Sequence, residues 1–512
     1  MEFKDSIYYK VGKASDLTGK DYFVYRVLEI IPGFLAWFTI ISIFLFSFLK
    51  PFYCAIFIIV FDVYWILKTL YLSIYLRQNW KKNKHNMSVD WKNKLSNLKY
   101  DRIHHVILLP FYDESWEIVE KSLRSIVNCE YEKSKLIVVL AAEERMKESS
   151  LEIFEKAKKE FSGVFEHLFF TIHPSDVLGE MKGKGSNIAY SAEEVRVEIL
   201  NKNSIKYEDV LVSAFDIDTV VYPQYFECLT WNFLTAENPL RSSFQPVPVF
   251  TNNIWESPAL SRVVSFSATF WQMIQQERPE ILATFSSHSV CFKTLYDVGY
   301  WQKNMVSEDS RIFWNSLLAY NGDYKVVPLS YPISMDSNLG QNFWQTIKNI
   351  YKQQRRWAWG VENGPYVLFG FLKNKKISIL KKAKFTFVLY EGFWSLSTNP
   401  LIIFFLGWLP IIFGGRDFNS TILSYNLPMV TKTLMTISML GLFLCLAIST
   451  SFLPPAPKWT NSSHKFVMMI QWLLIPFTII IFGAIPGLDA QTRLMLGKYM
   501  GFWVTPKHRK ND

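Results

Sequence analysis

The sequence predicts an α/β domain with a doubly wound, mostly parallel sheet, inserted between α-helical transmembrane segments. Short apolar runs alternate with helix-period segments over about residues 103–350, which is typical of sheets with helices on both faces. Apolar stretches of bilayer-spanning length lie on both sides of this block. Basic clusters border it at both ends, which indicates a cytoplasmic location for the soluble part. We therefore expect an integral protein of the cell's inner or plasma membrane.

The composition excludes several other classes of protein. Half of the 512 residues are hydrophobic, 17% are aromatic and 20% are charged, as expected for a chain that is partly in the membrane and partly in water. The formal net charge of +10 suits contact with membrane lipids and phosphate. The sequence has no helix or strand with a stripe of basic residues that could read a nucleic acid, so no nucleic-acid partner is expected. The five cysteines are scattered without a C-x-x-C pair, which argues against a zinc or disulfide framework.

The N-terminal part is predicted to anchor the chain. Residues 1–27 are polar, and residues 28–78 contain two apolar runs that we expect to be transmembrane helices. Only Lys50 and Pro51 separate the runs, so a tight helical hairpin is expected. The second run contains Asp62, and an intramembrane carboxylate either has a function or faces the interior of the helix bundle.

A soluble domain is predicted over residues 100–340. Apolar runs predict strands at residues 106–110, 135–140, 167–172 and 210–212, and helical spacing predicts helices around residues 116–127, 154–161 and 186–200. Ligands of such sheets bind beyond the carboxyl ends of the strands. Three of these ends carry acidic residues, which lie at 113–114, at 143–144 and at 216 and 218. Their convergence predicts a polar site on one rim of the sheet.

Asp216 and Asp218 form the centre of this predicted site. They follow a buried strand as Asp-x-Asp, with both carboxylates on one side of the chain. Two carboxylates in this position can hold Mg²⁺ or Mn²⁺, which usually keeps substrate phosphates as further ligands. Asp-x-Asp is also a short and common pattern, so its meaning depends on the rest of the chain.

Three further motifs have both a chemical and a structural interpretation. Residues 182–187, Lys-Gly-Lys-Gly-Ser-Asn, suit a diphosphate at a helix N-terminus, or they are an ordinary helix cap. Residues 307–309, Ser-Glu-Asp, present a general base or only cap a helix. Residues 353–357, Gln-Gln-Arg-Arg-Trp, can clamp a pyrophosphate and stack on a sugar, or anchor an interfacial helix to lipid headgroups.

The C-terminal part is predicted to return to the membrane. We expect interfacial helices at residues 341–384, transmembrane helices at residues 385–490 and a basic tail at residues 491–512. Hydropathy favours three spans, which put the tail outside, whereas the charge of the tail favours four spans and an inside location. The number of spans stays open at this point.

The order of these motifs resembles the membrane-integrated family 2 glycosyltransferases, which include cellulose, chitin, hyaluronan and glucomannan synthases. Their signature of D, DxD, (T/S)ED and QxxRW is matched by Asp216 with Asp218, by Ser307 to Asp309, and by Gln353 to Trp357. The resemblance implies a GT-A fold and an inverting hexosyltransferase. Its donor is expected to be a nucleotide-diphosphate-sugar, with a UDP-sugar favoured, and its acceptor a growing polysaccharide that the spans secrete.

The resemblance also implies a role for each matching residue. The nucleotide-sugar is expected to contact Tyr112, Glu114, Glu143, Lys184, Asn187 and Asp216. A divalent metal, Mg²⁺ or Mn²⁺, is expected on Asp218 with Asp216. Asp309 is expected to be the catalytic base, with Glu308 beside it. Gln353, Arg356 and Trp357 are expected to hold the diphosphate and to form the floor of the acceptor site.

The chain also departs from the family pattern. Position 113 is Asp where the family usually has Asn, and Glu143 stands where many relatives carry an aspartate-rich loop. His288 lies in a segment that is a small-residue acceptor motif in relatives, and it either touches the acceptor or is structural. Two other functions stay open. A single-addition transferase with a lipid acceptor fits the same motifs, and a transporter fits the spans but leaves the motifs without a role.

Overall fold

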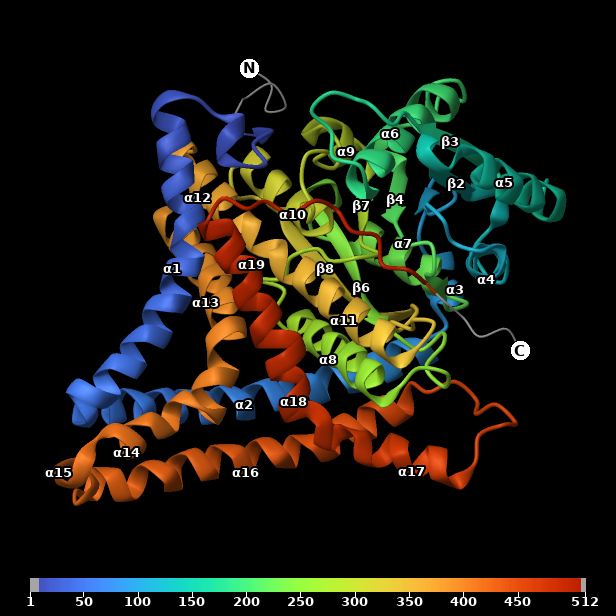
Figure 1. The fold of residues 1–512 in the computed structure, drawn as a ribbon. Helices are drawn as coiled ribbons and strands as arrows, with labels where there is room; N and C mark the ends of the chain where they lie inside the picture. Colours follow the sequence, from blue (N-terminus) through green and yellow to red (C-terminus); the bar gives the residue numbers. More distant parts are fainter. Residues whose placement is uncertain (1–8, 508–512) are drawn as a thin grey trace.

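A single sheet of eight strands organises the soluble part of the protein (Figure 1). The structure is a computed structural model that describes residues 9–507, apart from the side chains of residues 438, 440 and 442. The first eight residues of the predicted polar segment and residues 508–512 of the predicted basic tail lie outside this part. The strands are β1 (His104–Pro110), β2 (Leu136–Glu143), β3 (His167–His173), β4 (Val210–Ala214), β5 (Val220–Val221), β6 (Ser242–Val249), β7 (Ser289–Cys291) and β8 (Lys325–Ser334).

The topology confirms a mostly parallel α/β sheet. The strand order is β3-β2-β1-β4-β7-β6-β8-β5. The strands from β1 to β4 pair in parallel, as do β6 and β8, whereas β7 and β5 run antiparallel to their neighbours. The prediction includes β1 to β4 and misses the remaining strands. Strand β6 contains Pro246 and Pro248, which read as breaks in the sequence, and its pairing with β8 shifts register between Gln245 and Val247.

Helices cover both faces of the sheet, as doubly wound topology requires. The side chains of β1 alternate between them, with Ile107 and Leu109 in one hydrophobic core and Val106 and Leu108 in the other. The soluble helices are α3 (Trp91–Ser96), α4 (Trp116–Val127), α5 (Lys147–Phe161), α6 (Lys184–Val195), α7 (Tyr225–Thr235), α8 (Ala259–Gln276), α9 (Phe292–Val298), α10 (Glu308–Ala319), α11 (Phe343–Ala358) and α12 (Asn363–Lys373). Helices α4, α5 and α7 contribute to the first core, and α6, α9 and α10 to the second.

Nine helices of the described residues, the longest of them apolar, flank the block that contains the sheet on the N-terminal and C-terminal sides of the sequence. They are α1 (Gly19–Leu49), α2 (Pro51–Ser88), α13 (Ile379–Phe404), α14 (Leu409–Phe413), α15 (Gly415–Asn419), α16 (Ile422–Ser451), α17 (Ser462–Ile470), α18 (Ile475–Ile479) and α19 (Ile485–Met495). Within the described residues, three helical stretches are long and apolar enough to cross a membrane, namely 19–49, 51–88 and 462–495. Helices α13 and α14 form a fourth if they are one span bent by 47°.

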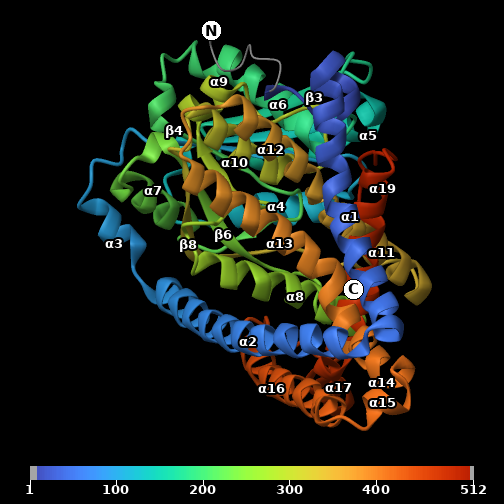
Figure 2. The ribbon, with the colours of Figure 1, turned by 90° about the vertical axis from the view of Figure 1, so that its left-hand side faces the viewer.

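The first two of these helices do not form the expected antiparallel hairpin. From Lys50, α1 and α2 diverge in both views (Figures 1 and 2). Helix α2 packs instead along α16 and against α8, while α1 packs against α19, α12 and α13. The part of each helix that is buried therefore has different partners, and most of the apolar surface of both helices is exposed.

This arrangement brings distant segments to the carboxyl edge of β4. Helix α11 packs against α19 and α8, so the arginines and tryptophan near its end lie beside the sheet. After α19 the chain turns back, and Figure 1 shows this last segment (red) running across the front of the sheet. The site is thus assembled from the soluble block and from the chain that follows the last apolar helix.

Candidate active site

Two carboxylates at the end of β4 lie at the centre of the polar cluster. Strand β4 ends at Ala214, and a turn closed by a hydrogen bond from the Thr219 amide to the Asp216 carbonyl (2.9 Å) follows it. Asp218 is 2% exposed, whereas the side chain of Asp216 keeps 30% of its surface accessible. The two side chains contact different cations, so the turn has an Asp216 side and an Asp218 side.

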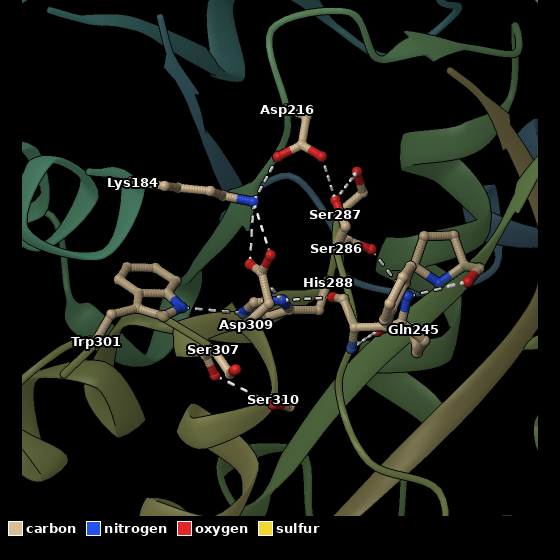
Figure 3. A network of polar contacts seen from close by, with 12 residues as sticks. Lys184, Asp216, Gln245, Ser286, Ser287, His288, Trp301, Ser307, Asp309 and Ser310 are labelled. Carbon is tan, nitrogen blue, oxygen red and sulfur yellow. Dashed lines mark hydrogen bonds and ion pairs between the residues drawn. The ribbon is translucent and has the colours of Figure 1, made fainter. Parts of the chain in front are cut away.

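On the Asp216 side, one lysine joins two candidate functional carboxylates (Figure 3). Lys184 Nζ, from the first residue of α6, donates to Asp216 Oδ1 at 2.7 Å and to Asp309 Oδ2 at 3.0 Å. Ser286 Oγ donates to the other oxygen of Asp216 at 2.7 Å. The structure therefore brings together residues from β4, α6 and α10 that are more than thirty positions apart.

The charges of this group stabilise one another. Burial would raise the pKa of Asp216, but the ammonium groups of Lys184 and Lys507 lower it below its usual range. Burial would likewise lower the pKa of Lys184, but Asp216 and Asp309 raise it well above its ordinary value. At neutral pH we therefore expect charged Lys184 and charged Asp216, a pair in which each partner compensates the desolvation of the other.

On the Asp218 side, the cation comes from the last described residue. Lys507 Nζ forms an ion pair with Asp218 Oδ1, and the amide of Asp336 donates to Oδ2 at 3.0 Å. Burial raises the pKa of Asp218, and Lys507 opposes this shift. Glu114, after β1, also lies within the electrostatic reach of both groups. Lys507 therefore pairs directly with Asp218, and the carboxylates of Asp216 and Glu114 also raise its pKa.

The loops after β1 and β2 bring the other predicted donor residues to the same rim. The Tyr112 amide donates to Glu114 Oε2 at 2.7 Å, which folds this loop on itself. Glu143 is buried in an ion pair with Arg145, and the Arg145 guanidinium lies 4.7 Å from the centre of the Tyr112 ring. Tyr112, Glu143 and Arg145 therefore form one cluster of aromatic and charged groups next to Glu114.

Two predicted residues are buried next to the polar cluster. The Asn187 amide donates to the Ala141 carbonyl at 2.7 Å, and its Oδ1 atom is buried without a hydrogen-bond partner among the described residues. Glu308 is 2% exposed, and burial and neighbouring Asp309 raise its pKa. A Cβ on Gly185 would lie 3.0 Å from Glu308 Cβ, so the starts of α6 and α10 are in close contact. The functional roles of Asn187 and Glu308 remain predictions.

The Gln-x-x-Arg-Trp motif lies near the C-terminal end of α11, close to the polar cluster. Gln353 Oε1 accepts a long hydrogen bond (3.5 Å) from Asn338. Trp357 packs between Phe250 and Phe285, with ring centroids 6.1 and 5.9 Å away. Since Phe285 precedes the serine that binds Asp216, the indole is linked to the carboxylate side of the cleft.

Arg356 lies under the C-terminal segment. Its guanidinium is 5.1 Å from the centre of the Phe502 ring, and its Nε is buried with no hydrogen-bond partner among the described residues. The same ring lies against Gly183, where a Cβ would come within 2.6 Å of Phe502. The φ of Gly183 is +149°, so a side chain is excluded there by both space and backbone conformation. Residues from α11, from the loop before α6 and from the last described segment therefore meet at Phe502.

Several residues of this cluster are not predicted from the sequence. Lys507 is predicted only as part of the basic tail, and Phe502, Ser286 and Trp301 have no predicted role. The Asp218–Lys507 contact spans 289 positions, and no local pattern indicates it. His288, noted as a departure from the family pattern, is found between Trp301 and Asp309 (Figure 3).

Known structures and curated proteins show similarity over most of the chain. A mannosyltransferase from Pyrobaculum calidifontis, solved with GDP-Man and Mn²⁺, is 11% identical and aligns with 86% of this chain and all of its own, with a TM-score of 0.44. Staphylococcus aureus TarS residues 1–349, solved with UDP-GlcNAc, is also 11% identical and aligns over 78% and 93% of the two chains, with a TM-score of 0.36.

Among curated proteins, poly-beta-1,6-N-acetyl-D-glucosamine synthases are similar in sequence. The Staphylococcus epidermidis protein is 25% identical over 329 residues, which are 62% of this chain and 68% of that protein. The Staphylococcus aureus strain COL protein is 22% identical over 328 residues, which are 62% and 67% of the two chains. The family model of glycosyl transferase family group 2 matches residues 211–482, more than half of the 512 residues. The chain therefore belongs to glycosyl transferase family group 2 and is a glycosyltransferase.

Proposed function

We propose that this glycosyltransferase transfers a sugar, with inversion, from a UDP-sugar to a growing polysaccharide at the membrane. The observation that supports it most is the position of Lys184 between Asp216 and Asp309 at the end of β4. Asp216 lies near two lysines, Lys184 and Lys507, and Asp309 lies at the start of α10. A donor diphosphate needs nearby cations, and an acceptor hydroxyl needs a base such as Asp309.

The mechanism needs only one base. Asp309 removes the proton of the acceptor hydroxyl as its oxygen attacks the anomeric carbon, while the bond to the donor diphosphate breaks on the opposite side. A single displacement of this kind inverts the anomeric centre. Lys184 Nζ lies 3.0 Å from the Asp309 carboxylate and holds it at the start of α10. Arg356, with its unpartnered buried Nε, is suited to the departing diphosphate because its planar fork binds phosphate oxygens.

The residues of the Asp218 side fit a divalent metal ion. Asp218 is a buried carboxylate that already pairs with a cation, and the carboxylate of Asp216 is near enough to affect its pKa. In the described part of the chain, no three His, Cys, Asp or Glu side chains form a metal cluster. This is consistent with Mg²⁺ or Mn²⁺, which often takes one or two carboxylates and completes its shell with substrate phosphates. When bound by Asp218 and Asp216, the ion supplies positive charge for the diphosphate leaving group.

Tyr112, Glu114 and Glu143 are proposed to bind the nucleoside. The aromatic ring provides a face for stacking, and the carboxylates accept hydrogen bonds from N–H and O–H groups. Arg145 adds a cation to the same cluster. Gln353 and Trp357 are proposed to form the acceptor floor, since α11 packs against the last apolar helix and Trp357 lies beside Phe285, the residue before the serine that binds Asp216.

The experiment is a transfer assay on the full chain in lipid nanodiscs. UDP-GlcNAc labelled in the sugar is the first donor to test, because the similar curated synthases are named for a polymer of N-acetylglucosamine. We expect UDP release, dependence on Mg²⁺ or Mn²⁺, and products of many sugars. A product with one sugar on a lipid would contradict the proposal that the acceptor is a growing polysaccharide. A lack of transfer from every UDP-sugar would contradict the proposal that the donor is a UDP-sugar.

A further inference from the structure

A histidine beside the candidate base is fixed on both sides of its ring (Figure 3). His288 precedes β7 and is fully buried. Its Nε2 atom lies 3.1 Å from the indole nitrogen of Trp301, and its Nδ1 atom lies 2.8 Å from the Phe285 carbonyl oxygen. Nδ1 is also 3.7 Å from Asp309 Oδ1, which is within electrostatic contact but longer than a hydrogen bond.

These partners determine where the imidazole carries its proton. An indole N–H can only donate, so Nε2 of His288 must accept and is unprotonated. The Phe285 carbonyl can only accept, so Nδ1 carries the hydrogen. Burial also lowers the pKa of His288, although Asp309 opposes this shift. The ring is therefore neutral, with its N–H edge towards the Phe285 carbonyl and the Asp309 carboxylate.

The tautomer limits what His288 can do for Asp309. Because Nδ1 already carries hydrogen, it cannot accept a proton from Asp309, so the pair is not a proton relay. Its N–H edge can stabilise a negative oxygen at Oδ1. Lys184 contacts Asp309 at 3.0 Å, so the carboxylate has two electropositive neighbours, one from α6 and one from the segment before β7.

We propose that His288, held by Trp301, is a positioning residue that keeps the carboxylate of Asp309 oriented for removal of the acceptor's proton. The inference rests on the proposed function, in which Asp309 is the base. It assigns a role to His288, for which the sequence left an acceptor contact and a structural role open, and to Trp301, for which the sequence predicted no role.

Two substitutions separate this role from simple packing. In His288→Asn the side-chain amide nitrogen can take the place of Nδ1, whereas in His288→Gln it reaches the place of Nε2. Glutamine is closer to histidine in volume, so packing alone favours His288→Gln. Orientation of Asp309 favours His288→Asn. The two interpretations therefore predict opposite orders of activity.

The test is steady-state transfer from labelled UDP-GlcNAc by the full chain in nanodiscs, with melting temperature measured for each variant. We expect kcat of His288→Gln and His288→Ala to fall by about tenfold or more. The fall should stay below the full contribution of general base catalysis, which is roughly 10²–10⁴-fold. We expect His288→Asn to stay within about threefold of wild type, and the donor KM of all three to stay within about twofold, since only the transition state is affected. Trp301→Phe, which frees Nε2, should lower kcat in the same way.

Two results would overturn the inference. The first is equal kcat for His288→Gln and wild type, and the second is a loss in all variants that follows melting temperature rather than side-chain geometry. The variant Asp309→Asn distinguishes failure of the role of His288 from failure of the proposed function. If Asp309→Asn is inactive while His288→Gln is fully active, only the role of His288 is wrong. If Asp309→Asn remains active, the assignment of the base is wrong.

Discussion

The two sides of the turn after β4 differ in where their cations come from. Asp216 pairs with Lys184, which begins a helix of the soluble domain and also holds Asp309. Asp218 pairs with Lys507, which lies in an extended segment after the last apolar helix. The first cation is built into the domain core, whereas the second can leave without unfolding the sheet. On the proposed function, we expect the Asp216 side to hold the reacting groups and the Asp218 side to exchange its cation when the donor binds.

The largest effect is expected from the base on the Asp216 side. Asp309→Asn removes the proton acceptor while keeping the size of the side chain, so kcat should fall by about 10²–10⁴-fold. The measurement is sugar transfer at saturating donor. The matched control is Asp323→Asn, an exposed aspartate in the same domain whose partner is Arg241. Transfer by Asp309→Asn within a few-fold of wild type would contradict the assignment.

A somewhat smaller effect is expected from the Asp218 side. Asp218→Asn removes one negative charge from the candidate metal site, so the stimulation of transfer by Mn²⁺ should be lost, and activity should fall by about 10²–10³-fold. The measurement is transfer as a function of Mn²⁺ concentration. The account fails here if Asp218→Asn shows the same metal saturation curve as wild type.

The exchangeable cation should affect binding of the donor rather than the chemical step. Lys507→Met removes the cation that pairs with Asp218. Once a metal ion takes Asp218, the ammonium can contact the donor diphosphate, so its loss should raise the donor KM by about three- to tenfold with little change in kcat. Lys184→Met is the comparison, and we expect it to lower kcat because it removes the partner of Asp309. Equal effects of both substitutions on kcat would remove the distinction between the two sides.

The smallest effect concerns stability. Burial raises the pKa of Glu308 above its ordinary value of 4.5, so the folded protein favours the protonated form. Below pH 4.5 wild type and Glu308→Gln should have similar stability, and as pH rises the buried charge should destabilise only wild type. The melting temperature of Glu308→Gln should therefore exceed that of wild type by about 2–4 °C at alkaline pH.

The control for this prediction is Glu152→Gln, an exposed glutamate on α5. The difference in melting temperature between Glu152→Gln and wild type should not change with pH. If the melting temperature of Glu308→Gln differs from that of wild type by the same amount at every pH, the pKa of Glu308 is not raised in the folded protein.

Local patterns predict the first half of the sheet and the motifs, because they depend on short-range periodicity and strand ends. Helix α4 has the predicted bounds of residues 116–127, and β1 to β4 are found at the predicted runs. Strand β6 contains two prolines, which are unusual within strands, and β7 has only three residues. Neither therefore shows the alternation of apolar and polar residues that predicts a strand. The distant contacts of the site have no local signal at all. Lys507 reaches Asp218, and Trp301 reaches His288, only because the fold brings their segments together.

The most direct test of the difference between the two sides is donor binding without turnover. Calorimetric titration of a non-hydrolysable UDP-GlcNAc analogue, with and without Mn²⁺, should show wild-type affinity in Asp309→Asn and loss of the metal-dependent part of binding in Asp218→Asn. The account would be contradicted if Asp218→Asn bound the analogue as tightly as wild type in Mn²⁺, or if Asp309→Asn lost binding.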